Sequence, residues 1–533
     1  MKGRRVDDFV DVTLPALLFD RAKSSESEIA FRFKEFGIYK GVTWGDYREN
    51  VENFASGLIE LGLKPGDTVA VMGEPCPEWC YADLGTLSAG GIVFGVYTTS
   101  SVEELGYVME VGEAKFFVAE DQEYVDKIML VIDRLPKLSK IIVIDTSTMF
   151  MYQDSRIISF TDTQELGRKR KEKYPQELSQ CISNLDPHGP AIIIFTSGTS
   201  GPPKPSVLSH HSIILGFALP HAEIIPDIWG TQYRTVAHLS MAHIAERGAS
   251  VYYPLIFNWI AHIGESPQYL QETLFEVQPT LVTAVPRIYE KIAAQAVTSI
   301  ESSSWIKKLS YRWAMSWGRA YMELKWKGEK IPLVRRLLRL AARQICFRHI
   351  LHRLGFSKIK LVYSVGAPLP APTQMMWQIW GVDMITVYGS TEASMVSAQR
   401  PGFPMPGNIG KPNAINKVAL AEDGEITVSG PGVFIGYWKD EKATREVKKE
   451  GWVYTGDVGE WTEEGNLRLI DRKKDIMITS GGKNITPSLI ETTLKGSPYI
   501  SEAVLIADGR KFPSALIEID FDTVSEWARR NKV

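Results

Sequence analysis

Short apolar runs and stretches with helical spacing alternate along the first part of the chain. The runs at 68–72, 92–96 and 115–119 predict buried strands, and the intervals 77–89 and 102–111 predict helices between them. Parallel strands need a crossover of this kind to be joined. The order therefore predicts an α/β fold with a mostly parallel sheet and helices on its faces.

Alternating apolar and polar positions mark two other regions. Residues 29–34 and 38–43 alternate on either side of a tight turn and predict a hairpin. Strand-like segments return at 425–429 and 467–470, where they predict a smaller β region. We therefore expect a large N-terminal domain of helix-flanked, mostly parallel sheets that also contains a β region.

The last part of the chain has a mixed pattern. Short strand-like runs between 475 and 520 accompany one helical segment at 487–494. This mixture predicts a small α+β domain at the C-terminal end.

Composition indicates a globular protein of more than one domain. The chain has 533 residues, of which 44% are hydrophobic and 23% charged, with a net charge of −3. A length of this kind favours two to four domains or one large multi-lobed unit. The charge balance does not indicate a nucleic-acid partner.

Several features favour the cytoplasm. Residues 1–12 are polar, unlike a signal peptide, and no apolar run approaches the ~18 residues of a membrane span. Four cysteines are few for this length, which fits a reducing compartment. Cys76 and Cys80 form a C-x3-C pair, which we interpret as ordinary cysteines because no further ligands lie near them in sequence.

Residues 305–353 differ from the rest of the chain. They carry thirteen Lys and Arg against two acidic residues, together with four of the fourteen tryptophans, and Pro332 divides them into two helical segments. Such a basic, aromatic pair can lie on an anionic membrane surface. The alternative is a solvated hairpin whose tryptophans pack inward.

An apolar strand at 191–195 runs into a loop rich in hydroxyls and glycines that ends at Lys204. Backbone N–H groups and hydroxyls in such a loop can hold phosphate, and the lysine adds a positive charge. The loop residues are Thr196, Ser197, Gly198, Thr199, Ser200 and Gly201. It is not a Walker P-loop, because Pro202 and Pro203 intervene before the lysine. A Ser/Gly turn that binds nothing is the alternative.

Six separated segments occur in the order of one family. They are 196–204, 242–247, 388–392, 454–457, 471–475 and 480–484. Together they resemble the acyl-adenylate-forming enzymes of the AMP-binding superfamily, over nearly the whole chain from about residue 14. Residues 285–291 and the basic helical insertion resemble the long-chain acyl-CoA synthetase branch, the long-chain-fatty-acid–CoA ligases.

The resemblance implies two half-reactions. A carboxylate attacks the α-phosphate of ATP, with Mg²⁺ as cofactor, and forms an acyl-adenylate and pyrophosphate. The thiol of coenzyme A then attacks the mixed anhydride and releases AMP. It also implies a large domain at 1–471, which binds AMP and the acyl group, and a small C-terminal domain at 472–533.

The resemblance assigns roles to residues along the nucleotide. Lys204 and the loop hydroxyls would hold the departing phosphates, Thr391 would contact phosphate, and Glu392 with Thr199 would hold Mg²⁺. Tyr388 would stack on adenine, while Asp457 and Arg472 would bind the ribose. Further nucleotide-binding positions implied by the resemblance are Gly366, Ala367, Gly389 and Ser390. A core tyrosine and a surface glutamate remain the alternatives for Tyr388 and Glu392.

Other implied roles concern coenzyme A and domain movement. His243 would line the acyl or pantetheine channel, for which a packed core histidine is the alternative. Gly481 and Gly482 would line the pantetheine tunnel, although a turn also explains them. Lys474 would be the hinge.

The sequence departs from the family at two places. Pro205 stands where the family has glycine, which removes one N–H and restricts the loop. The late lysine that contacts the α-phosphate has no counterpart before Val533. We therefore expect the C-terminal domain to be incomplete here, as a truncated form or one that has lost this role.

Several readings stay open at this stage. The first is a non-catalytic acyl- or nucleotide-binding protein, and the second is an adenylating enzyme with an acceptor other than coenzyme A. A fatty acid is the leading substrate, with a bulky steroid-like or aromatic acid as the alternative. A homodimer is also open.

Overall fold

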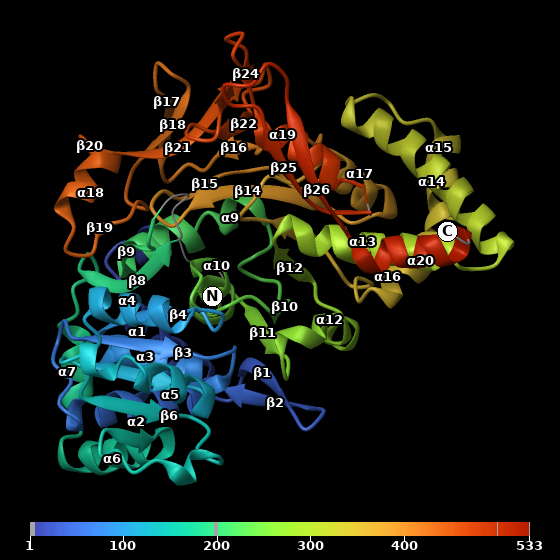
Figure 1. Cartoon of the computed structure of the whole chain (residues 1–533). Coiled ribbons are helices and arrows are strands. Elements are labelled where there is room, and N and C mark those ends of the chain that lie inside the picture. Colours follow the sequence, from blue (N-terminus) through green and yellow to red (C-terminus); the bar gives the residue numbers. More distant parts are fainter. Residues whose placement is uncertain (1–5, 197–200, 498, 532–533) are drawn as a thin grey trace. The chain divides into compact units, whose positions relative to one another are not determined.

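A computed structural model describes residues 6–196, 201–497 and 499–531 (Figure 1). Contacts divide the chain into two units. The first consists of Met1–Thr273, Thr391–Ser394 and Gly430–Gly451, and the second of Leu274–Ser390, Met395–Ser429 and Trp452–Val533.

The first unit is built on an eight-stranded sheet. Its strands, in spatial order, are β19 (Gly436–Tyr437), β9 (Lys204–Ser209), β8 (Pro190–Thr196), β4 (Ile92–Val96), β3 (Thr68–Met72), β5 (Phe116–Ala119), β6 (Lys140–Val143) and β7 (Ile157–Ser159). From β8 to β7 every neighbouring pair is parallel, while β9 and β19 are antiparallel. The predicted parallel sheet is therefore confirmed.

Helices join these strands and cover the sheet, as the blue and cyan ribbons of Figure 1 show. They are α2 (Trp44–Glu60), α3 (Pro77–Ser88), α4 (Val102–Gly112), α5 (Gln122–Met129) and α6 (Phe160–Lys173). All residues of β3, β4 and β5 are buried, as a parallel sheet covered on both faces requires. Gly167 allows α6 to approach α2, because a Cβ there would meet the Asn53 carbonyl oxygen.

A second sheet of the first unit has the order β10-β11-β1-β2. The predicted hairpin is its edge, formed by β1 (Ile29–Glu35) and β2 (Ile38–Thr43). Phe36 and Gly37 both have positive φ, as a tight hairpin turn requires. β10 (Tyr233–Ala237) and β11 (Trp259–Ile263) are parallel to one another.

The second unit contains two larger sheets. The first has the order β12 (Leu281–Ala284), β13 (Leu361–Ser364), β14 (Met384–Ser390), β15 (Ser394–Ala398) and β16 (Lys411–Pro412), and β12 to β14 are parallel. The second is the predicted β region, in which β17 (Lys417–Leu420), β18 (Glu425–Ser429), β21 (Trp452–Trp461) and β22 (Leu467–Arg472) are antiparallel.

The helices of the second unit include the basic segment. Among them are α13 (Pro286–Glu301), α14 (Trp305–Trp326), α15 (Leu333–Ala342) and α17 (Ala371–Trp380). The break at Pro332 is confirmed, because α15 starts directly after it. The part of the basic segment after Pro332 is not one regular helix, since a π-helical turn at Arg343–Phe347 separates α15 from α16 (Arg348–Arg353).

The C-terminal part of the second unit has its own small core. α19 (Pro487–Lys495) packs on the hairpin of β25 (Ile500–Ile506) and β26 (Ser514–Ile519), and Leu505 and Ala507 are buried. The predicted mixture of strands and one helix is confirmed, while α20 (Phe521–Asn531) was not predicted. The boundary between 471 and 472 stays a prediction.

Three buried histidines of the first unit should make its stability depend on pH. Burial lowers the pKa of His210, His221 and His262 to about 4 each, against about 6.5 in an unfolded chain. Between these values the unfolded chain binds protons that the folded chain excludes. The free energy of unfolding should therefore fall as the pH falls from about 6.5 to about 4, by up to about 1.4 kcal/mol per pH unit per histidine.

Urea unfolding at a series of pH values measures this slope. The variant His221→Phe should flatten it, since the ring lies in an aromatic cluster with Tyr253 and Trp259, whereas His349→Phe, at an exposed position, should not. Equal slopes in the two variants would show that burial of His221 does not control acid unfolding.

Candidate nucleotide site

Glu392 is held in the first unit by three hydroxyl groups from three strands. The Ser206 hydroxyl donates to Glu392 Oε1 at 3.0 Å and the Tyr437 hydroxyl at 3.3 Å. The Thr196 hydroxyl lies 3.2 Å from the same oxygen and 3.3 Å from the Lys204 carbonyl oxygen, so its single proton can serve either. The partly buried carboxylate is thereby fixed in one position.

Lys204 lies beside the same tyrosine. It begins β9, is paired with Thr196 across the β8–β9 ladder, and is exposed. Its ammonium group is 5.2 Å from the centroid of the Tyr437 ring. Tyr437 therefore contacts a fixed carboxylate through its hydroxyl and an exposed cation through its ring.

The rest of the predicted phosphate loop is only partly described. Ser197, Gly198, Thr199 and Ser200 lie outside the described residues. Gly201 has a φ of +121°, a backbone conformation that favours glycine. Pro205 is paired with Phe195, and its carbonyl oxygen accepts a hydrogen bond from the Trp438 N–H at 2.8 Å.

Thr391 and Glu392 belong to Thr391–Ser394, a short segment between β14 and β15 that is part of the first unit. Thr391 is buried, and the Glu392 carbonyl oxygen accepts a hydrogen bond from the Phe434 N–H at 2.9 Å. A Cβ at Gly216 would meet the side chain of Ser394 and the backbone of Gly432. This segment therefore packs closely on the core of the first unit.

A second cluster lies wholly in the second unit. The Tyr388 hydroxyl donates to Asp457 Oδ2 at 2.7 Å, and Arg472 Nε lies 3.5 Å from Asp457 Oδ1. Asp457 and Arg472 face one another across the β21–β22 ladder. Burial raises the pKa of Asp457, and the Tyr388 hydrogen bond and the Arg472 charge oppose that rise.

The remaining predicted nucleotide residues follow neighbouring parallel strands. Gly366 and Ala367 come after β13, and Gly389 and Ser390 end β14. The carboxyl ends of parallel strands are the usual place for ligands in such sheets. Burial and the Asp457 charge also raise the pKa of Tyr388, so its hydroxyl stays protonated.

Lys474 and the paired glycines lie in turns of the second unit. Lys474 is exposed in the turn after β22. Gly482 has a φ of +77° in the turn between β23 (Met477–Ile478) and β24 (Asn484–Ile485), so the turn explains this glycine. A Cβ at Gly481 would meet no atom within 4 Å.

His243 caps a short helix of the first unit. Its Nδ1 accepts a hydrogen bond from the Ala245 N–H at 3.0 Å at the start of α10 (Ile244–Arg247). The residue as a whole is exposed, so it is not a packed core histidine, although part of the ring is shielded from solvent. Loss of solvent around the ring still lowers its pKa, which favours the neutral imidazole at neutral pH.

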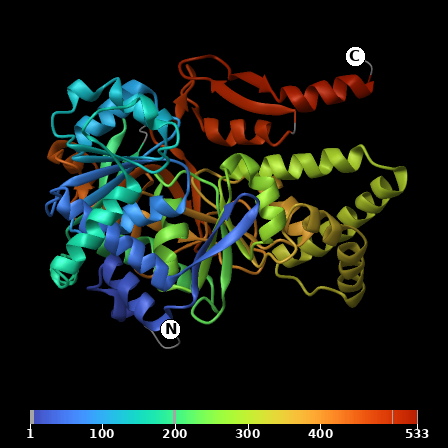
Figure 2. The ribbon, with the colours of Figure 1, turned by 90° about the horizontal axis from the view of Figure 1, so that it is seen from below.

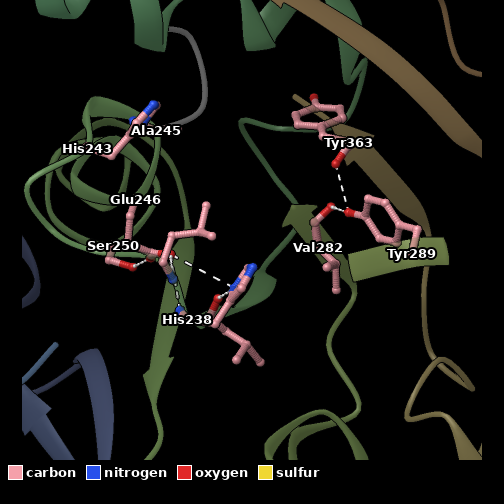
Figure 3. Close-up of polar contacts among 10 residues, drawn as sticks. His238, His243, Ala245, Glu246, Ser250, Val282, Tyr289 and Tyr363 are labelled. Carbon is pink, nitrogen blue, oxygen red and sulfur yellow. Dashed lines mark hydrogen bonds and ion pairs between the residues drawn. The ribbon is translucent and has the colours of Figure 1, made fainter. Parts of the chain in front are cut away.

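Sequence reasoning gave no role to the two residues that anchor this segment. The buried Glu246 carboxylate accepts from the backbone N–H groups of His238 and Leu239, at 3.1 and 2.9 Å, and from the Ser250 hydroxyl at 2.5 Å (Figure 3). Buried Arg247 donates to the Met241 carbonyl oxygen at 3.2 Å. The signal available in the sequence was their place in the segment 242–247, two adjacent charged residues close to His243.

One cavity of about 460 Å³ is lined by other residues. It is lined in the second unit by α14, α17 and Met405, and methionines form much of its wall. None of the residues predicted for the site is among its lining residues.

Comparison with known proteins identifies the family. A profile described as AMP-binding enzyme matches residues 18–438, and one described as AMP-binding enzyme C-terminal domain matches residues 474–531. The chain belongs to the AMP-binding enzyme family. The resemblance stated from the motifs is thus confirmed, and this family member is an enzyme of the acyl-adenylate-forming CoA ligase superfamily.

Similar curated proteins are named long-chain-fatty-acid–CoA ligases. FadD15 of Mycobacterium bovis is 29% identical over 524 residues, which cover 97% of this chain and 83% of that protein. Human ACSBG1 is 30% identical over 508 residues, which cover 92% of this chain and 68% of that protein.

Solved structures confirm the fold of this family member. The anthranilate CoA ligase AuaEII in complex with anthranoyl-AMP has a TM-score of 0.74 at 19% identity, covering 97% of this chain and 89% of that one. O-succinylbenzoate CoA synthetase from Bacillus subtilis, with ATP and magnesium, has a TM-score of 0.68 at 20% identity, covering 95% and 89%.

Proposed function

We propose that this enzyme activates a long-chain fatty acid with ATP and transfers the acyl group to coenzyme A. The observation that carries the proposal is that the fixed carboxylate of Glu392 and the exposed ammonium of Lys204 both contact Tyr437. A carboxylate that holds a metal ion and a cation that holds phosphate are the two charges that phosphoryl chemistry needs. The names of the curated relatives support a long-chain acid.

Glu392 fits Mg²⁺ by its chemistry. Mg²⁺ takes oxygen ligands and is usually bound by one or two carboxylates together with substrate phosphates. Within the described ranges, no three or more His, Cys, Asp and Glu side chains gather into a possible metal site. The bound ion would neutralise charge on the triphosphate, and Thr199 is the second predicted ligand.

The chain's own residues would then divide the work along ATP. Lys204 and the loop hydroxyls would hold the departing pyrophosphate while the fatty acid carboxylate attacks the α-phosphorus. Tyr388 would stack on adenine, oriented by its hydrogen bond to Asp457. Asp457 would accept hydrogen bonds from the ribose hydroxyls, and Arg472 would keep that carboxylate ionised and aligned.

Coenzyme A would meet a different set of residues. We propose that His243, presented by α10, lines the channel through which the thiol reaches the acyl-adenylate. Gly481 would leave room for the pantetheine arm, since the space around it is open. Lys474 would serve as the hinge, with the large domain ending at 471.

A panel of carboxylic acids tests the proposal. Acid-dependent pyrophosphate release, as kcat/KM, should rise from acetate through octanoate to palmitate, by at most about fourfold for each added CH₂. Coenzyme A should convert the product to a thioester. Benzoate, anthranilate and cholate serve as ring-bearing comparisons.

Each competing reading has its own outcome in this panel. A maximum at acetate, or activity on ring-bearing acids alone, would contradict the proposal that the substrate is a long-chain fatty acid. ATP binding without pyrophosphate release on any acid would identify a non-catalytic binding protein. Adenylate formation without thioester would point to another acceptor.

A further inference from the structure

Helix α15 turns an arginine inward and its leucines outward. Its exposed residues include Leu333, Val334, Leu337 and Leu340, with exposed fractions of 70%, 65%, 56% and 55%. At 100° per residue these four side chains fall on one side of the helix. Soluble proteins normally place such a stripe against their core, so this orientation needs an explanation.

Arg339 fixes the helix in this orientation. Its guanidinium donates to the carbonyl oxygens of Gln378 and Ile379, at the C-terminal end of α17, and it lies over the rings of Tyr321 and Phe347. These carbonyls carry the negative end of a helix dipole, which favours a cation. Burial lowers the pKa of Arg339 to about 10, so the side chain remains charged at neutral pH.

Two glycines leave the space that Arg339 occupies. A Cβ at Gly318 would lie 3.2 Å from Arg339 Nη1 and 2.9 Å from the Ile379 side chain. A Cβ at Gly381 would lie 3.2 Å from Nη2, and its φ of +106° already favours glycine. The inward arginine is therefore built into the packing of α14, α15 and α17.

Other apolar and basic side chains of the same segment are also exposed. Ile345 is 58% exposed after α15, and Trp305 and Trp313 of α14 are 71% and 55% exposed. These two tryptophans do not pack inward, whereas Trp317 and Trp326 are half-buried and Trp326 donates a hydrogen bond to the Gln378 side chain at 2.6 Å. The alternative of inward-packed tryptophans therefore holds for two of the four. Arg335 and Arg336 are exposed on α15 itself, within a segment of thirteen basic and two acidic residues. Figure 2 shows the helices in yellow-green, reaching beyond the strands of the same unit.

We infer that the outer face of α15 docks on an anionic lipid membrane, with Leu333, Leu337 and Leu340 among the acyl chains and the arginines at the headgroups. The ten-residue helix is only about 15 Å long, too short to span a bilayer, so it would lie in the interface. Among the described residues, no helix combines the length and apolarity needed to cross a membrane.

Charge selects the membrane over a second copy of this chain. Two copies meeting through α15 would bring two strongly basic segments together, and like charges oppose such a contact. An anionic membrane supplies both an apolar layer and compensating negative charge. The inference does not rest on the proposed reaction, because vesicle binding can be measured without substrates.

Flotation of the full chain with vesicles tests this docking. Binding should occur to phosphatidylcholine vesicles that contain phosphatidylglycerol, and should weaken as salt rises, because screening shortens the range of the attraction to about 10 Å at about 0.1 M. The triple variant Leu333→Gln, Leu337→Gln, Leu340→Gln should bind at least about tenfold more weakly. The pair Arg335→Gln, Arg336→Gln should lose about tenfold on anionic vesicles only.

Matched variants make the result decisive. Leu130→Gln changes a leucine that is 75% exposed elsewhere on the chain and should bind as the parent does. Unchanged thermal midpoints would show that the variants are folded. Equal binding of the triple variant and Leu130→Gln would overturn the docking, as would absence of binding at low salt. A parent dimer that the triple variant converts to a monomer would identify a second copy as the occupant instead.

Discussion

Replacing Glu392 with glutamine should lower the rate of acid-dependent pyrophosphate release about 10²-fold or more. Three hydroxyl groups hold the carboxylate in place, so a glutamine of the same shape would stay there without its charge. The loss would then report the missing charge on the metal and triphosphate. Steady-state kinetics over a range of Mg²⁺ concentrations measures it, and the Mg²⁺ requirement should shift upward.

A charge-matched variant separates this effect from a general change in electrostatics. Glu441 also lies in the first unit, and its side chain is 84% exposed in an ion pair with Arg445. Glu441→Gln should leave the rate and the Mg²⁺ dependence unchanged. If Glu392→Gln behaved in the same way, Glu392 would not be the metal ligand.

Replacing Asp457 with asparagine should lower kcat/KM for ATP, on the order of 10- to 10²-fold, because a buried hydrogen-bonded charge is lost. Asparagine cannot accept hydrogen bonds through both of its side-chain terminal atoms. It would therefore disturb either the Tyr388 hydroxyl or the ribose hydroxyls. ATP titrations of pyrophosphate release would measure the change.

Tyr388→Phe gives a graded comparison. It removes the hydroxyl that donates to Asp457 but keeps the ring for stacking, so its loss should be smaller, about three- to tenfold. Glu463→Gln, at an exposed position in the turn between β21 and β22, serves as the charge control. ATP kinetics that are alike in Asp457→Asn and Glu463→Gln would remove Asp457 from the ribose site.

The local pattern of hydrophobic and turn residues was sufficient to predict most of the helices and strands. The strands and helices between 68 and 119, the hairpin of β1 and β2, and the break at Pro332 follow from spacing and turn chemistry within a few residues. The same kind of reasoning missed α20 and the π-helical turn at Arg343–Phe347. Helical spacing alone does not distinguish a π turn from a continuing α-helix.

The order of motifs likewise indicated the family, and therefore the residues of the candidate site. It did not indicate how those residues are held. Thr196 and Ser206 lie 196 and 186 residues from Glu392 in sequence, so only the sheet topology brings the three together. The pairing of Asp457 with Arg472 depends on the register of β21 and β22, which local pattern leaves undetermined.

The sequence by itself determined that 305–353 is helical, basic and rich in tryptophan. Only the tertiary structure decided which face of α15 is turned outward. Amphipathic spacing predicts that a helix has an apolar face, and it favours placing that face against the core. Here the carbonyls at the end of α17 bind Arg339 instead, in the space that Gly318 and Gly381 leave. The leucines consequently remain exposed.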